Sequence, residues 1–72
     1  MKGGFILIYM SGKIMQSKRK EKKLTQREVA KYLEVSRQYY NDLENGKRRP
    51  SVELSKKIGE VLDIDWTIFF AE

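Results

Sequence analysis

The sequence lacks cysteine and histidine altogether and has a single proline among its 72 residues. Without cysteine there is no disulfide framework and no thiolate zinc site, which fits a reducing cytoplasm as the place of action. Without histidine the commonest metal ligand and the commonest general base are missing. We therefore expect no enzymatic activity, no metal and no cofactor. A chain of this length forms one domain, near the lower size at which a single core suffices.

Basic residues outnumber acidic ones, and the net charge is +5. They are concentrated between Lys13 and Lys31 and again at positions 47–49. The charges after Lys57 are all acidic: Glu60, Asp63, Asp65 and Glu72. This asymmetry indicates a basic face toward a polyanion. A lysine-rich soluble surface with no partner would give the same composition, so charge alone does not decide between the two interpretations.

The most informative stretch runs from Leu24 to Gly46 and opens with a helix start signal. Thr25 and Glu28 have the spacing of a capping box, in which each side chain satisfies a free backbone N–H. Leu24 and Val29 flank this box at the spacing of a hydrophobic staple. An apolar stripe at helical spacing follows, made of Val29, Ala30 and Leu33. The pattern predicts a short helix.

A second short helix is predicted to begin at Ser36, an N-cap candidate, and to end at Asn45-Gly46. Tyr40 and Leu43 would point inward from it. Because the connection to the preceding helix is so short, the two helices must cross at a steep angle, which is the helix-turn-helix arrangement. The second helix is then prominent. Its outward residues can all hydrogen-bond a base edge: Arg37, Gln38, Asn41 and Asp42.

The pattern T-Q-x-E-x-A-x-x-L-x-V-S-x-x-x-x-x-x-L-E-N-G-K-x-x-P-S resembles the phage-repressor (Cro-like, XRE-type) helix-turn-helix family of DNA-binding regulators. The resemblance extends over about residues 14–70. It implies an all-α, five-helix domain over residues 12–72, with the third helix in the major groove of DNA. Arg37 would donate to guanine and Gln38 would read adenine, with Asn41 at the periphery. Asp42 could accept from a cytosine amino group or orient Gln38, and the sequence leaves both options open.

Contacts to the DNA backbone are expected around this helix. Gln26 begins the preceding helix, where the positive end of the helix dipole faces a phosphate. The resemblance implies the same role for Asn45. Lys47 and Arg48 stand in the loop behind the recognition helix, and three further positions could add contacts: Arg27, Ser36 and Tyr39. Such contacts orient a protein on DNA without reading its sequence.

The resemblance also implies an ion pair between Arg19 of the first helix and Glu44 of the third. Three positions just after predicted helices carry other residues where the family often has glycine: Lys23, Glu34 and Asp63. Those positions usually prefer a left-handed backbone, which costs a non-glycine residue about 1 kcal/mol. Gly59 replaces the alanine usual in the fourth helix, and it predicts a close helix–helix approach there.

The other helices have weaker signals. A first helix over about residues 12–22, a fourth helix and a last short helix over about residues 66–70 are expected, with these N-caps: Ser11, Ser51 and Asp65. We expect Tyr40, Trp66 and Phe69 in the core. Phe70 is a candidate for a dimer contact.

Residues 1–11 are predicted to form a short apolar N-terminal arm or strand outside this domain. The run from Phe5 to Met10 is continuous, β-prone and too short to span a bilayer, so we expect no membrane partner. It could be a strand that pairs with its copy in a dimer, an arm lying on the helical core, or a disordered leader. An uncovered run of this kind would be an aggregation hazard, so we expect it to be covered or paired.

Together these features predict a sequence-specific DNA-binding transcriptional regulator, a repressor that binds double-stranded DNA. A domain this small makes few base contacts, so we expect a homodimer on a palindromic operator. The alternative is an antitoxin-like or other protein-binding module that grips a protein partner through the N-terminal arm or the aromatic C-terminus. In that case Arg37→Ala and Gln26→Ala would leave function intact.

Overall fold

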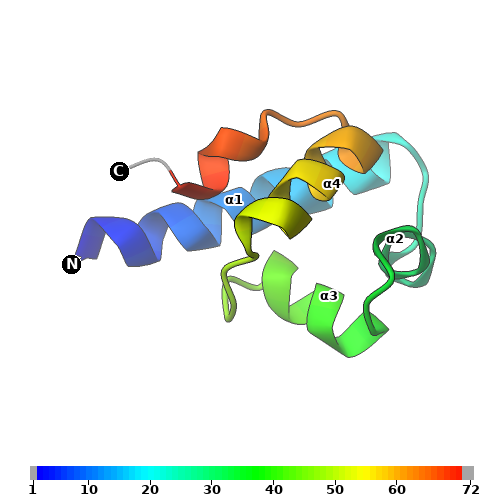
Figure 1. Ribbon diagram of the computed structural model, residues 1–72, viewed down its shortest axis with the longest axis horizontal. Coiled ribbons are helices and arrows are strands. Elements are labelled where there is room, and N and C mark those ends of the chain that lie inside the picture. The colour runs from blue at the N-terminus through cyan, green and yellow to red at the C-terminus, as the bar shows by residue number, and fades with distance from the viewer. Residues whose placement is uncertain (1, 71–72) are drawn as a thin grey trace.

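The computed structural model describes the backbone of residues 2–70 and the side chains of residues 10–70. This part of the chain forms four α-helices and one 3-10 helix: α1 (Lys2–Glu21), α2 (Gln26–Leu33), α3 (Arg37–Glu44), α4 (Val52–Leu62) and η1 (Trp66–Phe70) (Figure 1). No strand occurs within these limits. The all-α prediction is confirmed. The expected fifth α-helix is a 3-10 helix, too short to complete more than a turn or two.

Helix α1 runs along the longest dimension of the molecule. Its 20 residues extend about 30 Å at the usual helical rise, close to the largest extent of 33 Å. In Figure 1, η1 lies above α1 and α2 and α3 lie below it, while α4 overlaps α1 in this view and the first turns of α1 extend beyond the other helices. The helix-turn-helix therefore lies beside the C-terminal half of α1.

The N-terminal arm or strand expected over residues 1–11 is wrong for residues 2–11, which belong to α1; residue 1 lies outside the described part. Ser11 does not cap a helix. It lies in the middle of α1 and is buried against the rest of the protein, and its hydroxyl donates a hydrogen bond to the Ile68 carbonyl oxygen at 3.3 Å. A short apolar run shows neither the helical nor the strand period. Packing holds the turns that follow the run in a helix. Extending this helix toward the N-terminus over the run therefore needs only helix propagation and avoids the free-energy cost of a new nucleus.

The hydrophobic core lies where the five elements meet. Trp66 was expected in this core but is only partly buried at its margin, with its ring edge-on to Phe70 at 6.2 Å between centroids. Tyr40 and Phe69 are buried, as predicted. Among the residues with described side chains, the buried hydrophobic ones are Met15, Val29, Ala30, Leu33, Tyr40, Leu43, Ile58, Leu62 and Phe69.

The left-handed backbone predicted at three non-glycine positions is confirmed. The φ angles are 59° at Lys23, 62° at Glu34 and 61° at Asp63. At Glu34 this conformation ends α2, and the Glu34 N–H donates to the Lys31 carbonyl oxygen at 3.1 Å. Each such residue costs about 1 kcal/mol relative to glycine, so the fold must be held by interactions that outweigh this strain.

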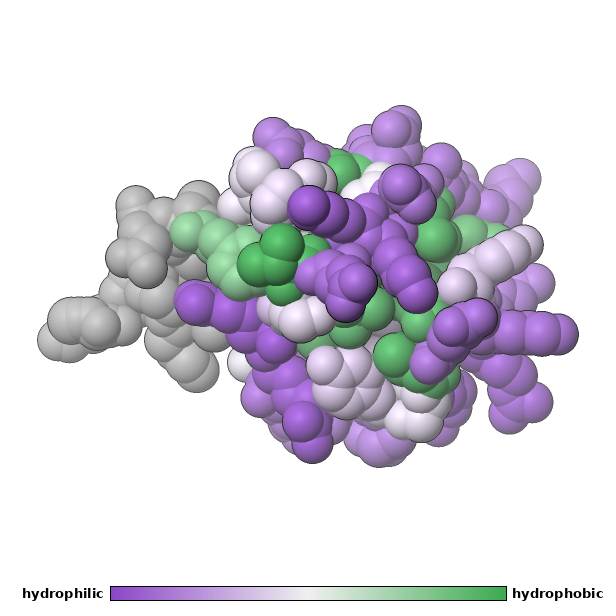
Figure 2. Space-filling view, viewed as in Figure 1, coloured by the Kyte–Doolittle hydropathy of each residue, from purple (hydrophilic) through white to green (hydrophobic). Residues whose placement is uncertain are grey.

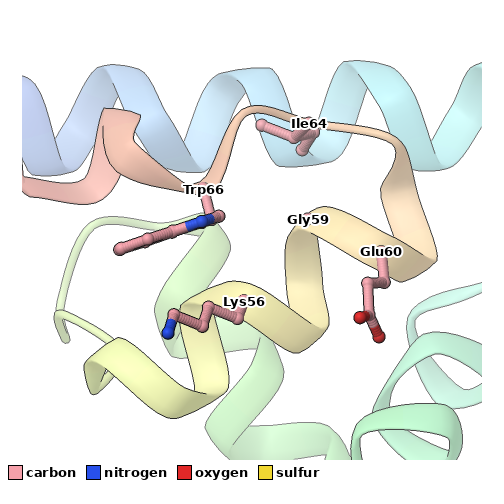
Figure 3. A pocket seen from close by; sticks show the side chains of 5 residues that line it. All are labelled: Lys56, Gly59, Glu60, Ile64 and Trp66. Atoms are coloured by element: carbon pink, nitrogen blue, oxygen red, sulfur yellow. The ribbon is translucent and has the colours of Figure 1, made fainter.

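Two glycines mark places where backbone segments approach too closely for a side chain. A Cβ at Gly12 would lie 2.8 Å from the Leu43 carbonyl oxygen and would also meet the backbone of Glu44, so α1 crosses the end of α3 in direct contact. A Cβ at Gly59 would lie 2.6 Å from the Ile64 carbonyl oxygen. The approach predicted at Gly59 is therefore real, but its tightest contact is with the segment after α4, and Trp66 Cβ at the start of η1 would lie 3.3 Å away (Figure 3).

Candidate nucleic-acid interface

Side-chain caps fix the start of both helices of the α2–α3 unit. Thr25 and Glu28 form the predicted capping box: Thr25 Oγ1 accepts from the Glu28 N–H at 3.1 Å, and Glu28 Oε1 accepts from the Thr25 N–H at 2.8 Å. Ser36 caps α3, and its Oγ accepts from the Tyr39 N–H at 3.0 Å. Between the caps, the left-handed Glu34 turns the chain sharply. The direction in which α3 leaves α2 is thus set by local backbone chemistry.

Arg19 and Glu44 form a buried ion pair, as the resemblance implies. Arg19 Nε donates to Glu44 Oε2 at 2.6 Å and Arg19 Nη2 donates to Glu44 Oε1 at 3.3 Å. Arg19 Nη1 also donates to the Leu24 carbonyl oxygen at 2.9 Å. The two side chains are 10% and 2% exposed. The pair joins α1 to the last turn of α3 and to the segment that leads into α2.

Burial alone would raise the pKa of Glu44, but the hydrogen bonds from Arg19 and Gln26 and the nearby hydroxyl of Tyr40 outweigh it, so the pKa is lowered. Burial, and then the Glu44 carboxylate, raise the pKa of Tyr40. The Tyr40 hydroxyl is buried beside the Glu44 carboxylate, but it makes no hydrogen bond with any described residue. Glu44 is therefore held as a charged group in the interior.

Gln26 connects this buried pair to the exposed surface. Its Nε2 donates to Glu44 Oε1 and to Asn41 Oδ1, both at 3.0 Å. Its Oε1 accepts from Arg37 Nη1 at 3.4 Å. One amide at the start of α2 thus binds three side chains of α3. The network runs from the interior to the first residue of α3.

The four predicted base-contacting residues lie on the outer face of α3. Arg37 and Gln38 are exposed, and Asn41 and Asp42 are partly exposed. Their spacing places them within one helical stripe. Gln38 Nε2 donates to Asp42 Oδ1 at 3.1 Å. In Figure 2 the surface in this region mixes hydrophilic and intermediate residues with hydrophobic ones.

The predicted phosphate-contacting residues surround this stripe. Tyr39 is partly buried and packs against the core, with the Arg48 guanidinium 5.1 Å from its ring centroid. Arg48 Nε also lies 3.5 Å from Asp42 Oδ2. Gln26 is partly buried, as described above. The remaining predicted positions have exposed side chains: Arg27, Ser36, Asn45 and Lys47.

Three features were not predicted from the sequence: the close backbone approach at Gly12, the bridging role of Gln26 and the contact of Arg48 with Tyr39. For Gly12 a signal was present. Gly12, Met15 and Arg19 recur at helical spacing, so a glycine stands on the same face as a core residue and a buried arginine. Nothing in the sequence marks the other two, because they depend on how loops and helices meet in space.

Two other kinds of site are absent from residues 10–70, whose side chains are described. No group of three or more histidine, cysteine, aspartate or glutamate residues could hold a metal ion there. No described helix combines the length and the hydrophobicity that crossing a membrane requires. The polar face of α3 and the residues around it form the candidate site, because they bring most of the predicted base- and phosphate-contacting residues together.

A short helix, a tight turn and a second helix with an exposed polar face define a helix-turn-helix domain. The chain belongs to the XRE-type helix-turn-helix family of DNA-binding transcriptional regulators, whose sequence profile, described as "Helix-turn-helix", matches residues 15–69.

Two relatives support this assignment. The chain is 54% identical over 63 residues to a Bacillus subtilis (strain 168) protein described as "Uncharacterized HTH-type transcriptional regulator YqaF", with 88% of this chain and 83% of the relative aligned. It is 40% identical over 57 residues to the "ImmF control region 10 kDa protein" of Bacillus phage phi105. That alignment includes 79% of this chain but 63% of the phage protein, so the phage relative is the longer of the two.

Proposed function

We propose that this chain is a sequence-specific repressor that reads the major groove of double-stranded DNA with α3. It would act as a homodimer on a palindromic operator, with half-sites about one helical turn apart. The observation that carries the proposal is the hydrogen-bonded network from Arg19 through Glu44 and Gln26 to Arg37. We place its action in the cytoplasm, where bacterial DNA is read.

The network supports DNA reading because it fixes the outer face of α3 before a ligand arrives. Binding normally costs free energy for each long side chain that must be ordered, and a preorganised surface avoids part of that cost. Arg37, a long side chain at the start of α3, is tethered to Gln26. Base edges are read by such side chains near the N-terminus of a recognition helix.

The charges around α3 also favour DNA. Lys47 is exposed in the loop that follows α3, and Arg27 is exposed on α2. Asp42, an acid on the outer face of α3, is paired with Arg48 and so does not stand as an isolated negative charge. The phage relative is described as a control-region protein, which is in keeping with a regulatory role.

Homodimerisation is proposed because one domain of 8.5 kDa offers few base contacts. Phe70, expected as a dimer contact, is partly buried, with Arg49 5.8 Å from its ring centroid. Met10 and Ile14 are better candidates. They are 52% and 40% exposed and lie one turn apart on α1.

The test is selection of bound sequences from a random pool of DNA duplexes, at low and at physiological salt. We expect a palindrome with a guanine and an adenine in each half, and Arg37→Ala should reduce the preference for guanine about tenfold. The matched control is Lys20→Ala, which removes a charge from an exposed position on α1 and should keep the same preference. In analytical ultracentrifugation, the bound protein should add twice 8.5 kDa to the mass of the enriched duplex.

Two results would contradict the proposal. Salt-sensitive binding with no enriched sequence would leave only electrostatic attraction to the phosphates. An absence of DNA binding, together with function that survives Arg37→Ala and Gln26→Ala, would favour the protein-binding alternative.

A further inference from the structure

Asp42 stands on the face of α3 that carries the polar residues, where a carboxylate would be repelled by phosphates. Each of its oxygens has a partner. Gln38 Nε2 donates to Oδ1 at 3.1 Å, and Arg48 Nε lies 3.5 Å from Oδ2. The carboxylate therefore bridges an amide on its own helix and a guanidinium from the loop after that helix.

The partners of Asp42 stand further out than Asp42 itself. The Asp42 side chain is 19% exposed, whereas the Arg48 side chain is 56% exposed. Gln38 is exposed as well. The Arg48 guanidinium lies over the Tyr39 ring, 5.1 Å from its centroid, so Arg48 is held from two directions. A ligand approaching α3 would meet the amide and the guanidinium before the carboxylate.

We propose that Asp42 is a positioning residue and not a base reader. It fixes the amide of Gln38 so that this side chain selects adenine, while Arg48 neutralises the carboxylate against the DNA. This inference rests on the proposed function and names the residue that sets part of its specificity.

The chemistry of the amide explains the selection. A glutamine side chain offers N–H donors on one atom and a carbonyl acceptor on another, and a free amide can flip between the two orientations. A carboxylate only accepts, so Gln38 Nε2 must face Asp42 and the carbonyl oxygen must face away. The remaining N–H and the carbonyl match adenine, which presents an acceptor at N7 and a donor at N6, whereas guanine presents two acceptors.

Arg48 connects this base contact to the DNA backbone. Its Nε lies 3.5 Å from Asp42 Oδ2, so its terminal N–H groups can reach a phosphate. Asp42 would then be held most firmly when Arg48 is bound to DNA in the correct register. Without Arg48 the carboxylate would face the phosphates uncompensated, and binding to any duplex would weaken.

The first test needs no DNA. The ¹⁵N relaxation of the Gln38 side-chain amide should report a restrained group in the wild-type protein and a mobile one in Asp42→Ala. The control is Arg49→Ala, which removes a neighbouring arginine that lies over Phe70 instead of Tyr39. An equally mobile amide in wild type and Asp42→Ala would overturn the proposal.

The second test uses the duplex enriched by the wild-type protein and the same duplex with the adenine read by Gln38 changed to guanine. Asp42→Ala should reduce the preference between the two about tenfold. Asp42→Asn keeps an acceptor but adds a donor, so it no longer forces Gln38 Nε2 to face position 42 and should lose part of the preference. If Asp42 instead reads cytosine, both variants will relax selection at a different base pair and keep the adenine preference, and the proposal is then wrong.

The Arg48 step is tested by a double-mutant cycle. Arg48→Ala should weaken binding several-fold more when Asp42 is present than in Asp42→Ala, because only then is a carboxylate left unpaired. Strict additivity would overturn this step. If the wild type enriches no sequence at all, the proposed function has failed and the adenine role with it. If a sequence is enriched and Asp42→Ala keeps its adenine preference, the positioning role alone has failed.

Discussion

Replacing Glu44 with glutamine tests whether the buried ion pair holds α1 on α3. The change keeps the size of the side chain but removes the charge that faces Arg19 across 2.6 Å. The Arg19 guanidinium would remain buried, with the Leu24 carbonyl oxygen as its other acceptor. Glutamine could accept one hydrogen bond, yet it could not compensate the positive charge.

The expected loss follows from the burial of the pair. Breaking a buried ion pair on one side costs about 3–5 kcal/mol, and because Arg19 keeps one acceptor we expect the lower end, about 3 kcal/mol. At roughly 0.05–0.15 kcal/mol per residue, a domain of this size has about 4–11 kcal/mol of stability. The loss would thus be a large fraction of the total. It corresponds to a fall in Tm of at least about 12 °C.

The assay is urea denaturation followed by circular dichroism. The control is Glu21→Gln, which breaks an exposed ion pair between Lys18 and Glu21 at 3.7 Å and should cost less than about 0.5 kcal/mol. The double variant Arg19→Met/Glu44→Leu should recover most of the lost stability, since replacing both ions by apolar groups is often neutral. A cost for Glu44→Gln as small as that of the control would refute the reasoning.

Four further predictions concern the stability of the same fold. Gly12→Ala should lower the free energy of unfolding by about 1–3 kcal/mol, because its Cβ would meet backbone at 2.8 Å, whereas Ser17→Ala on the exposed side of α1 should cost nothing in the same urea titration. Glu34→Gly should raise the urea midpoint, gaining about 0.5–1 kcal/mol by relieving the left-handed backbone at φ 62°. Tyr40→Phe should be neutral or stabilising in thermal melts, and a loss above about 1 kcal/mol would mean that its hydroxyl is hydrogen-bonded after all. Folding lowers the pKa of Glu44 from 4.5. The stabilisation from its charge is therefore complete above the unfolded pKa and is lost as the pH falls through the folded pKa. The free energy of unfolding, measured from pH 6 to about 2, should fall more steeply for the wild type than for Arg19→Met/Glu44→Leu.

The parts of the fold that could be predicted from the sequence depend on neighbouring residues. The Thr25 capping box and the Ser36 cap are hydrogen bonds within one turn of helix, so residue type and spacing are enough to predict them. The left-handed positions, such as Glu34, were expected from the resemblance, because the family often has glycine where these helices end. The polar stripe of α3 follows from helical periodicity once its two ends are known.

The parts that could not be predicted depend on contacts between distant segments. The apolar run before Met10 has no period that distinguishes a helix from a strand, so its helical state is decided by the packed turns that follow it. Ser11 has the chemistry of an N-cap and is used instead as a donor to Ile68 across the core. Trp66 has the hydrophobicity of a core residue but lies at the margin, where the Lys56 ammonium is 5.3 Å from its ring centroid.

The two oxygens of Glu44 join folding to the candidate interface. Both oxygens accept hydrogen bonds from Arg19, which holds α1 in place, and Oε1 also accepts one from Gln26, which holds Arg37 at the surface. A buried charge of this kind is a poor source of stability, since an apolar pair of similar volume would serve as well. An apolar pair would leave the Gln26 amide without one of its acceptors, however. Gln26 would then be held less firmly, and so would Arg37, which donates to it. The ion pair is therefore best understood as a means of orienting the surface of α3, with stability as its secondary effect.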